Sequence, residues 1–278
     1  MKIIVVAGAR PNFMKVAPIL DALSTRCAKN PEIQVRFVHT GQHYDKKMSH
    51  DFFSDLCMPD PDINLGIGPG SHAEQTARAM VGFENVCVVE QPDWVVVVGD
   101  VNSTLACSIS AKKLGIRVAH VEAGLRSMDR SMPEEINRLC TDAISDLLFT
   151  TDETASQNLY REGIPAHRVH FVGNTMIDTL LRNLDRALQT PLPCGIGSDN
   201  YAVLTLHRPA TVDSPSILGS VSSVIGEVAD KLRVIFPVHP RTRKNLEAFG
   251  LMERLSSNVS FIEPLSYLSF IGLTARST

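Results

Sequence analysis

Short apolar runs alternate with longer amphipathic segments along most of the chain. The apolar runs are rich in β-branched residues and lie at about residues 3–7, 35–39, 94–99, 116–121, 146–150 and 168–172. Four consecutive valines, Val95 to Val98, are typical of a central strand that is buried on both faces. Strands that alternate with helices predict a parallel sheet covered on both faces, so this part of the chain is predicted to be an α/β domain of the Rossmann-like type.

A second set of the same pattern follows residue 173. A helix-like segment at about 176–188 leads into a turn-rich linker at 191–200, and apolar runs in 201–209, 232–240 and 259–264 predict three further strands. We therefore expect two domains, residues 1–173 and residues 174–278. The second is expected to be a partial Rossmann-like domain, because the chain stops before a second sheet of the size of the first is complete.

Composition narrows the functional classes. The 278 residues are 44% hydrophobic with a formal net charge of −3, and no run of Lys and Arg occurs, so no nucleic-acid partner is expected. No apolar stretch has the length of a membrane span and no targeting segment is recognisable, which predicts a cytoplasmic protein without membrane contact. Six scattered cysteines without a C-x-x-C pair predict reduced thiols. His120-Val-Glu122 resembles the H-x-E of zinc deaminases, but no P-C-x-x-C follows, so no metal is expected.

Two carboxylates follow buried strands. Asp100 comes directly after the valine-rich run, and Glu122 comes directly after the run at 116–121. Open α/β sheets bind ligands at the carboxyl ends of their strands, so both acids could face one crevice and serve as acid and base. For Asp100, capping of the following helix is an equally good explanation. For Glu122, burial beside a strand carries a desolvation cost that a binding site explains better than packing does.

A third group of charges lies at a helix start, in residues 133–138. Pro133 suits the first turn, and acids there complement the helix dipole. Glu134 and Arg138 are four residues apart, which is the spacing of a common stabilising pair. Taken alone, this segment is therefore explained by structure rather than by catalysis.

The remaining candidates lie near other predicted strand ends. The first turn, Gly8-Ala-Arg10-Pro11, lacks the three glycines of the dinucleotide fingerprint, so no nicotinamide or flavin cofactor is expected. Arg10 at a helix start is a plausible phosphate site, although a surface arginine on a turn would explain it too. Gln42 and His43 follow the second strand, and His207 ends a strand of the second domain, where it could face the cleft between the domains.

Six motifs, in order, carry a resemblance to a known family. They are Gly8-Ala-Arg-Pro11 with Lys15, Gly99-Asp100 with Ser103-Thr104, His120-Val-Glu-Ala-Gly-Leu-Arg126, Pro133-Glu-Glu-Ile-Asn-Arg138, Gly173-Asn-Thr175 and Leu206-His-Arg-Pro209. Together they resemble the bacterial non-hydrolysing UDP-N-acetylglucosamine 2-epimerases, from residue 1 to about residue 275. The third and fourth motifs are the specific pair, because the hydrolysing relatives lack them.

The resemblance implies the fold of the two-domain GT-B glycosyltransferases, with the substrate between the domains. It implies reversible inversion at C2 of the sugar of UDP-GlcNAc, giving UDP-ManNAc for surface polysaccharide, by elimination and re-addition of UDP without a cofactor. Asp100, Glu122 and Glu134 would be the acid and base carboxylates, and His207 would assist departure and return of the UDP. The substrate-binding residues would be Arg10, Lys15, Gln42, His43, Asn174 and Arg138, the last of which would orient Glu134.

The chain departs from the family pattern in two ways. Members continue past the position of Thr278 with a Ser-Gly-Gly-x-Gln-Glu-Glu segment that binds the uridine and diphosphate, and the arginine expected near Gly68 for an activating second UDP-GlcNAc is absent. The alternative function is therefore a catalytically inactive remnant that binds a UDP-sugar or a partner. A retaining glycosyltransferase is a third hypothesis, which the motifs favour less. An exposed sheet edge would favour association, and we expect a homodimer.

Overall fold

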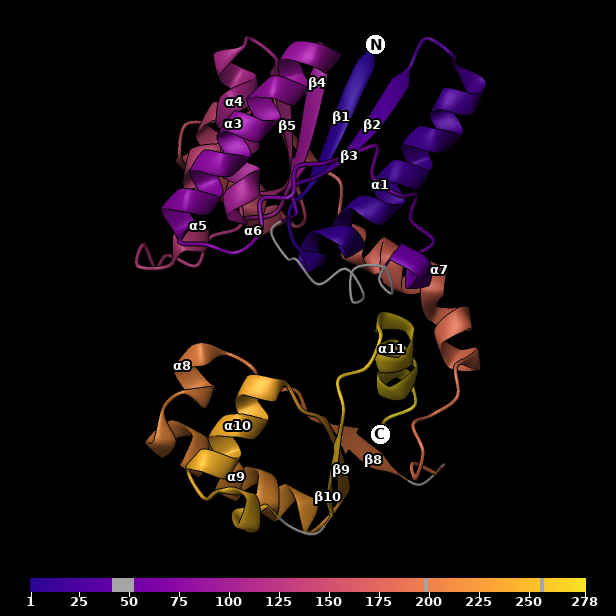
Figure 1. The fold of residues 1–278 in the computed structure, drawn as a ribbon, viewed down its shortest axis with the longest axis vertical. Helices are drawn as coiled ribbons and strands as arrows, with labels where there is room; N and C mark the ends of the chain where they lie inside the picture. Colours follow the sequence, from indigo (N-terminus) through magenta and orange to yellow (C-terminus); the bar gives the residue numbers. More distant parts are fainter. Residues whose placement is uncertain (42–52, 198–199, 256–257) are drawn as a thin grey trace. The chain divides into compact units, whose positions relative to one another are not determined.

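The computed structural model describes residues 1–41, 53–197, 200–255 and 258–278, and it divides the chain into two compact units, Met1–Arg182 and Asn183–Thr278. The division falls inside helix α7 (Thr175–Gln189), which begins just after residue 173, where we predicted the domain boundary. Each unit contains one parallel sheet with helices beside it (Figure 1).

A seven-stranded parallel sheet forms the centre of the first unit. Its order is β3-β2-β1-β4-β5-β6-β7, so the chain starts in the interior of the sheet and builds outward on both sides. This order reverses between β1 and β4, and open sheets bind their ligands at such a switch point. The strands are β1 (Lys2–Ala7), β2 (Gln34–His39), β3 (Ile63–Asn64), β4 (Trp94–Val98), β5 (Arg117–Ala123), β6 (Leu147–Thr150) and β7 (Val169–Phe171). All six strands predicted for this region are confirmed, and among the strands that the structure describes here only the short β3 was not predicted.

Helices lie on both faces of this sheet (Figure 1). Besides α7 they are α1 (Arg10–Lys29), α3 (His72–Glu90), α4 (Asn102–Lys113), α5 (Pro133–Ile144) and α6 (Glu153–Arg161), with a 3-10 turn at Ala166–Arg168. Val95 and Val97 of β4 pack in one core cluster with Phe83 of α3 and Cys107 of α4. Helix α1 packs against β1, β2 and β4 on the other face. The alternating orientation of strand side chains thus explains why the valine run is apolar at every position.

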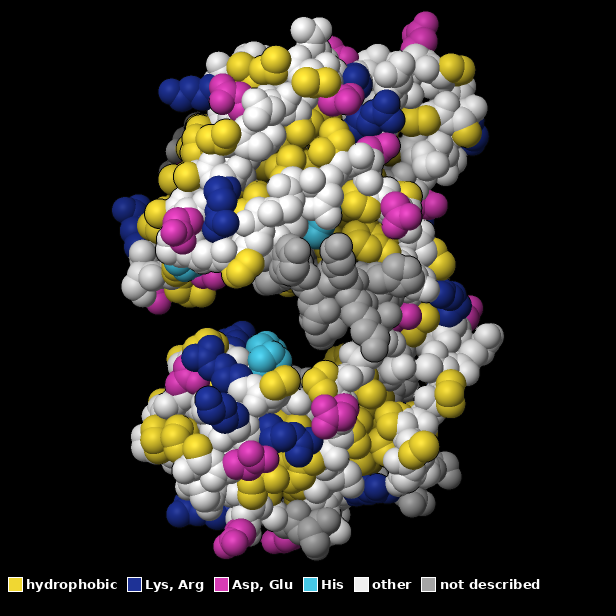
Figure 2. Space-filling model, viewed as in Figure 1, with side chains coloured by type: hydrophobic (Ala, Val, Ile, Leu, Met, Phe, Trp, Pro, Cys, Tyr) yellow, Lys and Arg dark blue, Asp and Glu magenta, His cyan; other side chains and the backbone are white. Residues whose placement is uncertain are grey.

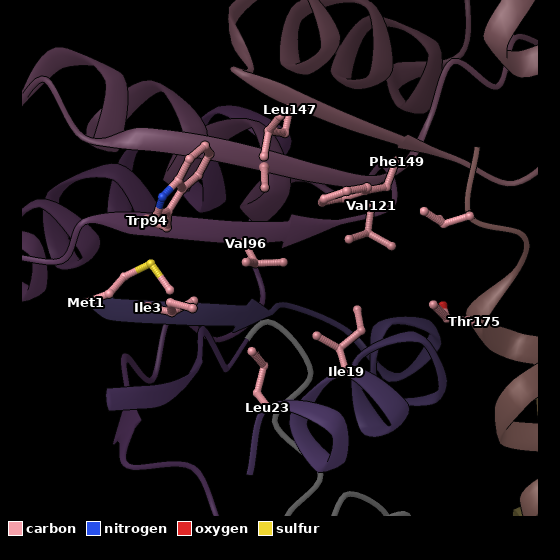
Figure 3. A pocket seen from close by; sticks show the side chains of 12 residues that line it. Met1, Ile3, Ile19, Leu23, Trp94, Val96, Val121, Leu147, Phe149 and Thr175 are labelled. Carbon is pink, nitrogen blue, oxygen red and sulfur yellow. The ribbon is translucent and has the colours of Figure 1, made fainter. Parts of the chain in front are cut away.

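The face that carries α1 retains an apolar pocket of about 360 Å³ (Figure 3). Ile3, Val96, Val121 and Phe149 line it from the sheet, and Ile19 lines it from α1. The predicted cover of both faces by helices is therefore incomplete on this side, within the described part of the chain.

The second unit is smaller. Its parallel sheet has the order β10-β9-β8 and consists of β8 (Tyr201–Val203), β9 (Arg233–Pro237) and β10 (Val259–Ile262). Its helices are α8 (Pro209–Val212), α9 (Pro215–Ala229), α10 (Pro240–Ala248) and α11 (Tyr267–Ala275), with a 3-10 turn at Met252–Arg254. Leu218 of α9, Phe236 of β9 and Leu246 of α10 form part of its core. The three predicted strands and the smaller second domain are confirmed.

Charged side chains of both signs are interspersed on the face shown in Figure 2. Lys and Arg do not gather there into the continuous basic stripe that a polyanion would need. Of the helices in the described ranges, none combines the length and the apolar character needed to cross a bilayer.

Candidate active site

A glycine with a left-handed backbone stands at the switch point of the large sheet. Gly99 directly follows β4 and has φ of +70°, which glycine adopts without steric cost. Its N–H donates to the carbonyl of Val121 (3.0 Å), and its own carbonyl accepts from Nε2 of His120 (2.8 Å). These bonds join the tip of β4 to β5 and hold the peptide that leads into Asp100.

Three side chains crowd the space beside Gly99. A Cβ atom at this position would lie 3.1 Å from Nζ of Lys15, 3.3 Å from Nδ2 of Asn12 and 3.3 Å from Oε2 of Glu122. Lys15 and Asn12 come from α1, and Glu122 comes from β5. The absence of a side chain at Gly99 therefore allows these polar groups to approach one another.

Glu122 is held in a strained backbone conformation. Its φ is +70°, and it falls where the register of β5 with β6 shifts between Val121 and Ala123. The left-handed region costs a non-glycine residue about 1–2 kcal/mol, and such strain is found mostly at functional sites. Oε2 of Glu122 pairs with Nζ of Lys15, and the two side chains are only 17% and 11% exposed. The pair is thus largely shielded from water.

Asn12 fastens the start of α1 to the sheet. Its Oδ1 accepts the N–H groups of Gly8 (3.1 Å) and Ala9 (3.0 Å), and its Nδ2 donates to the carbonyl of Val98 (3.0 Å). Because Asn12 is 2% exposed, these bonds satisfy groups that water does not reach. Our reading of the sequence missed this residue. The available signal was an amide at the third position of a helix, where a side chain can bond back to the helix start.

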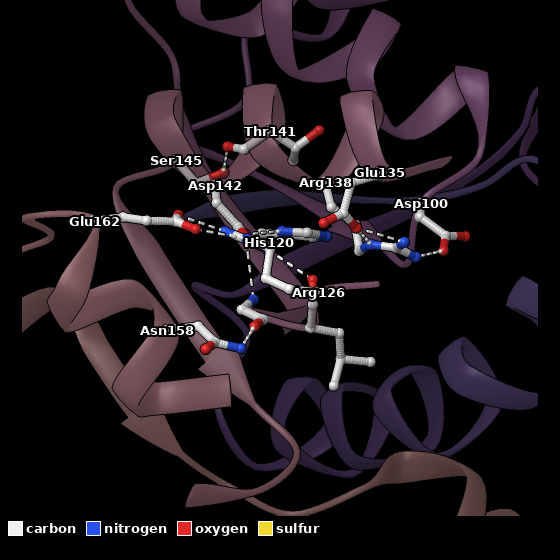
Figure 4. Close-up of polar contacts among 12 residues, drawn as sticks. Asp100, His120, Arg126, Glu135, Arg138, Thr141, Asp142, Ser145, Asn158 and Glu162 are labelled. Carbon is white, nitrogen blue, oxygen red and sulfur yellow. Dashed lines mark hydrogen bonds and ion pairs between the residues drawn. The ribbon is translucent and has the colours of Figure 1, made fainter. Parts of the chain in front are cut away.

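Asp100 pairs with Arg138 of α5. The Arg138 guanidinium lies 2.5 Å from Oδ2 of Asp100 and 2.7 Å from Oε2 of Glu135, so it bridges the two carboxylates (Figure 4). Asn137 also donates to the backbone carbonyl of Asp100 (2.8 Å). We predicted that Arg138 would orient Glu134, and the structure corrects this, because its partners are Glu135 and Asp100. Successive helical residues differ by about 100° in direction, and Glu135 is the acid on the buried side.

Glu135 is ionised although it is buried. Burial opposes the charge, but the backbone N–H groups of Ser127 (3.0 Å) and Met128 (3.1 Å) and the guanidinium of Arg138 together lower the pKa of Glu135 to about 2. Glu135 thereby anchors the loop after β5 to α5. The sequence suggested only a helix-dipole role for this residue, because the loop that supplies its partners is not predictable from local pattern.

A second set of charges is buried beneath the strand tips. Nδ1 of the fully buried His120 lies 2.6 Å from Oδ1 of Asp142 (Figure 4). The other oxygen of Asp142, Oδ2, accepts the N–H of Gly124 (3.0 Å) and lies 2.8 Å from the guanidinium of Arg126. Burial opposes ionisation of Asp142, but His120 and Arg126 hold the pKa of this carboxyl below its usual value. Arg126 also pairs with Glu162 (2.6 Å). Sequence reasoning missed Asp142. Its position two turns after Glu135, on the same helix face, was the only signal.

The other predicted site residues are placed as follows. His207 is exposed in the segment between β8 and α8 of the second unit. Asn174 accepts the N–H of Met176 at its Oδ1 (2.9 Å), at the start of α7. Gln42, His43 and the side chain of Arg10 lie outside the described residues. The roles assigned to these residues stay predictions.

The cluster has the components of acid–base chemistry. Asp100 follows β4 and lies beside Arg138. Glu122 lies near the end of the adjacent strand β5 and beside Lys15. Glu134 is half-buried in the first turn of α5, and its side chain makes no hydrogen bond or ion pair with another described residue. Carboxylates fixed in this way can take up and return protons, and the cations can attract an anionic substrate. Over the described ranges, no three His, Cys, Asp or Glu side chains are grouped so as to hold a metal ion.

Comparisons with known proteins show a consistent relationship. A family model described as UDP-N-acetylglucosamine 2-epimerase matches residues 25–278. A UDP-N-acetylglucosamine 2-epimerase of Methanococcus maripaludis is 42% identical over 281 residues, which cover 98% of this chain and 75% of that protein. A UDP-2,3-diacetamido-2,3-dideoxy-D-glucuronate 2-epimerase of Pseudomonas aeruginosa is 40% identical over 281 residues, which cover 100% of this chain and 76% of that protein.

The fold is similar as well. The crystal structure of Methanocaldococcus jannaschii UDP-GlcNAc 2-epimerase in complex with UDP-GlcNAc and UDP matches with a TM-score of 0.84 at 42% identity, covering 98% of this chain and 76% of that one. The predicted fold class is thereby confirmed, and so is the resemblance inferred from the six motifs. Since the family model spans most of the chain and relatives align along nearly all of it, the chain belongs to the UDP-N-acetylglucosamine 2-epimerase family.

Proposed function

We propose that this chain interconverts UDP-GlcNAc and UDP-ManNAc by inverting C2 of the sugar. One observation of the structure supports this most directly: Asp100 and Glu122 stand at neighbouring strand tips, both beside Gly99, and each contacts a cation. Membership of the family supports the reaction class, and a solved relative is described in complex with UDP-GlcNAc and UDP.

The proposed reaction is an elimination followed by a re-addition. A carboxylate takes the C2 proton while the bond between C1 and the β-phosphate oxygen breaks, so that UDP leaves and a 2-acetamidoglucal with a C1–C2 double bond remains. A proton then adds to C2 from the opposite face, and the UDP oxygen re-forms the bond to C1. The C2 proton is weakly acidic, so its removal must be coupled to departure of UDP, with both charges stabilised where they develop.

The two faces of the sugar require more than one proton carrier. The proposed acid and base groups are Asp100, Glu122 and Glu134, and His207 is proposed to assist departure and return of UDP. Arg138 acts on the reaction by holding Asp100, which it contacts directly. The proposed substrate-binding residues are Arg10, Lys15, Gln42, His43, Asn174 and Arg138, of which Arg10 and Lys15 would hold the diphosphate.

A second substrate is also a candidate. The Pseudomonas aeruginosa relative named for UDP-2,3-diacetamido-2,3-dideoxy-D-glucuronate is 40% identical, close to the 42% of the relative named for UDP-GlcNAc. Its named substrate differs from UDP-GlcNAc at C3 and C6, so the same carboxylates could invert C2 of either sugar. Separate incubation with each sugar nucleotide would decide which one turns over.

Deuterium exchange tests the proposal directly. The chain is incubated with UDP-GlcNAc in D2O, and 1H NMR follows loss of the C2 proton signal and formation of UDP-ManNAc. Deuterium at C2 is expected in both sugars, because each return step takes its proton from a group that exchanges with solvent. Absence of exchange for both candidate substrates at high protein concentration would contradict the proposed function.

The variant Glu122→Gln tests the role of this carboxylate. Loss of a positioned acid or base lowers a rate by about 100- to 10,000-fold, and we expect C2 exchange to fall by at least the lower figure. Glu153→Gln, an exposed acid in the first turn of α6, is the matched control and should exchange like the wild type. Circular dichroism checks that both variants fold, and an unchanged rate in folded Glu122→Gln would remove Glu122 from the mechanism.

Three further points remain proposals: the homodimer, the cytoplasmic location and the supply of UDP-ManNAc for surface polysaccharide. Size-exclusion chromatography with light scattering tests the dimer, for which a mass of about twice 30.4 kDa is expected. A monomer mass at micromolar concentration would contradict it.

A further inference from the structure

The proposed mechanism leaves one buried group of this region without a role. His120 is 0% exposed, so it does not meet a substrate. Both of its ring nitrogens nevertheless have polar partners, the carbonyl of Gly99 at 2.8 Å from Nε2 and the carboxylate of Asp142 at 2.6 Å from Nδ1. The protonation of the ring follows from the nature of these partners.

A carbonyl oxygen can only accept a hydrogen bond, so Nε2 must carry a proton. Asp142 is the ionised partner on the other side, because its second oxygen accepts the N–H of Gly124 and pairs with Arg126. A carboxylate also accepts only, so Nδ1 must carry a proton as well. A ring protonated at both nitrogens is a cation. The two cations His120 and Arg126 then balance the two anions Asp142 and Glu162, with which they are in contact.

We infer that His120 is a buried imidazolium that positions the two strand tips of the site, an inference that rests on the proposed function. Its Nε2 holds the carbonyl of Gly99, in the peptide directly before Asp100. Its own strand, β5, carries Glu122 two residues further on. One ring therefore sets the positions of both carboxylates relative to each other, and His120 is a positioning residue without contact to the reacting atoms.

The contact with Asp142 extends this role to a third element. Asp142 lies on α5, the helix that also carries Glu134 and Arg138. The ring consequently links the segment directly after β4, the strand β5 and the helix α5, which carry Asp100, Glu122 and Glu134. Removing one partner of such a buried charge pair leaves the other uncompensated, which is strongly destabilising. A test must therefore separate positioning from folding.

Two amide variants separate the two bonds of the ring. The side-chain nitrogen of His120→Gln reaches the place of Nε2 and can donate to Gly99, whereas that of His120→Asn reaches the place of Nδ1 and can donate only to Asp142. Both variants lose the same charge, so both should unfold at a lower temperature than the wild type. We expect kcat with UDP-GlcNAc to fall about 100-fold in His120→Asn but about tenfold or less in His120→Gln, with KM changed by less than about threefold in both.

The comparison is made at equal folded fraction, measured by circular dichroism. A purely structural role would lower the activity of both variants in proportion to the folded fraction. Equal kcat per folded molecule in the two variants would therefore overturn the inference.

A second measurement does not depend on activity. In the wild-type chain labelled with 15N-histidine, His120 should give N–H signals from both ring nitrogens, identified by their loss in His120→Gln. Both signals should be present, because the carbonyl of Gly99 and the carboxylate of Asp142 each accept one of the two ring protons. A single N–H signal would show a neutral ring and overturn the inference. Two signals in a chain that turns over neither substrate would support the imidazolium and refute the proposed function.

Discussion

Replacing Gly99 by alanine should perturb the backbone and the site in separable ways. The residue has φ of +70°, so a side chain there adds the strain of the left-handed region, about 1–2 kcal/mol. The new Cβ would also lie 3.1 Å from Nζ of Lys15 and 3.3 Å from Oε2 of Glu122. These atoms end flexible side chains, so they can move aside at little cost to folding. The Lys15–Glu122 pair would nevertheless be displaced from its place beside Gly99.

Gly115 provides the matched control. It is an exposed residue between α4 and β5 with φ of +74°, and a Cβ there would have no neighbour within 4 Å. Gly115→Ala therefore adds the same backbone strain without a contact in the site. Because 1 kcal/mol shifts Tm by about 2–4 °C in a domain of this size, both variants should lower Tm by about 2–8 °C.

Only Gly99→Ala should lower kcat. A displacement of about 1 Å can reduce a rate about 100-fold, so a shift of roughly a few tenths of an ångström at Glu122 predicts a loss of about tenfold. Differential scanning fluorimetry gives Tm, and formation of UDP-ManNAc at saturating UDP-GlcNAc gives kcat. The reasoning would be refuted by an unchanged kcat in Gly99→Ala, or by an equal loss in the two variants.

Two further predictions concern stability. Asn12→Ala should lower the free energy of unfolding by about 2–6 kcal/mol, because the N–H groups of Gly8 and Ala9 would lose their buried partner, at about 1–3 kcal/mol for each group, whereas the carbonyl of Val98 keeps the hydroxyl of Thr104 (2.9 Å). Urea denaturation measures this loss, and a value below about 1 kcal/mol would contradict the role of Asn12. The folded pKa of Glu135, about 2, lies below its ordinary 4.5, so its ionised form stabilises the fold above the unfolded pKa and this contribution is lost as pH falls toward 2. The stability difference between the wild type and Glu135→Gln should therefore be largest above about pH 5 and shrink at lower pH, and a constant difference would argue against it.

Much of the fold was predictable because strand signals are local. The valine run 95–98 and the apolar run before Glu122 identify buried parallel strands from a few consecutive residues, and both are confirmed as β4 and β5. The carboxyl ends of parallel strands lie at one edge of the sheet, which is why Asp100 and Glu122 could be proposed as neighbours. Glu122 does lie beside Gly99, the residue next to Asp100.

The partners of the site residues were not predictable in the same way. Glu134 and Glu135 are identical residues in one helical turn, and only the packing of α5 shows that Glu135 is the one that binds Arg138 and the loop at Ser127. The apolar pattern likewise gives no indication that Asp142 is ionised beside His120, since an acid on an amphipathic helix is expected to face water.

The sequence by itself therefore determined the strands and their direction, because a few consecutive residues are enough to show burial and periodicity. It also determined the family, because each of the family motifs is a contiguous segment. The tertiary structure alone decided which charges meet and where the backbone is strained. Lys15 and Glu122 are 107 positions apart in the chain, and their contact depends on the left-handed backbone of Glu122 and on the space beside Gly99. Contacts of this kind arise only when distant segments pack together, so no local pattern of residues can specify them.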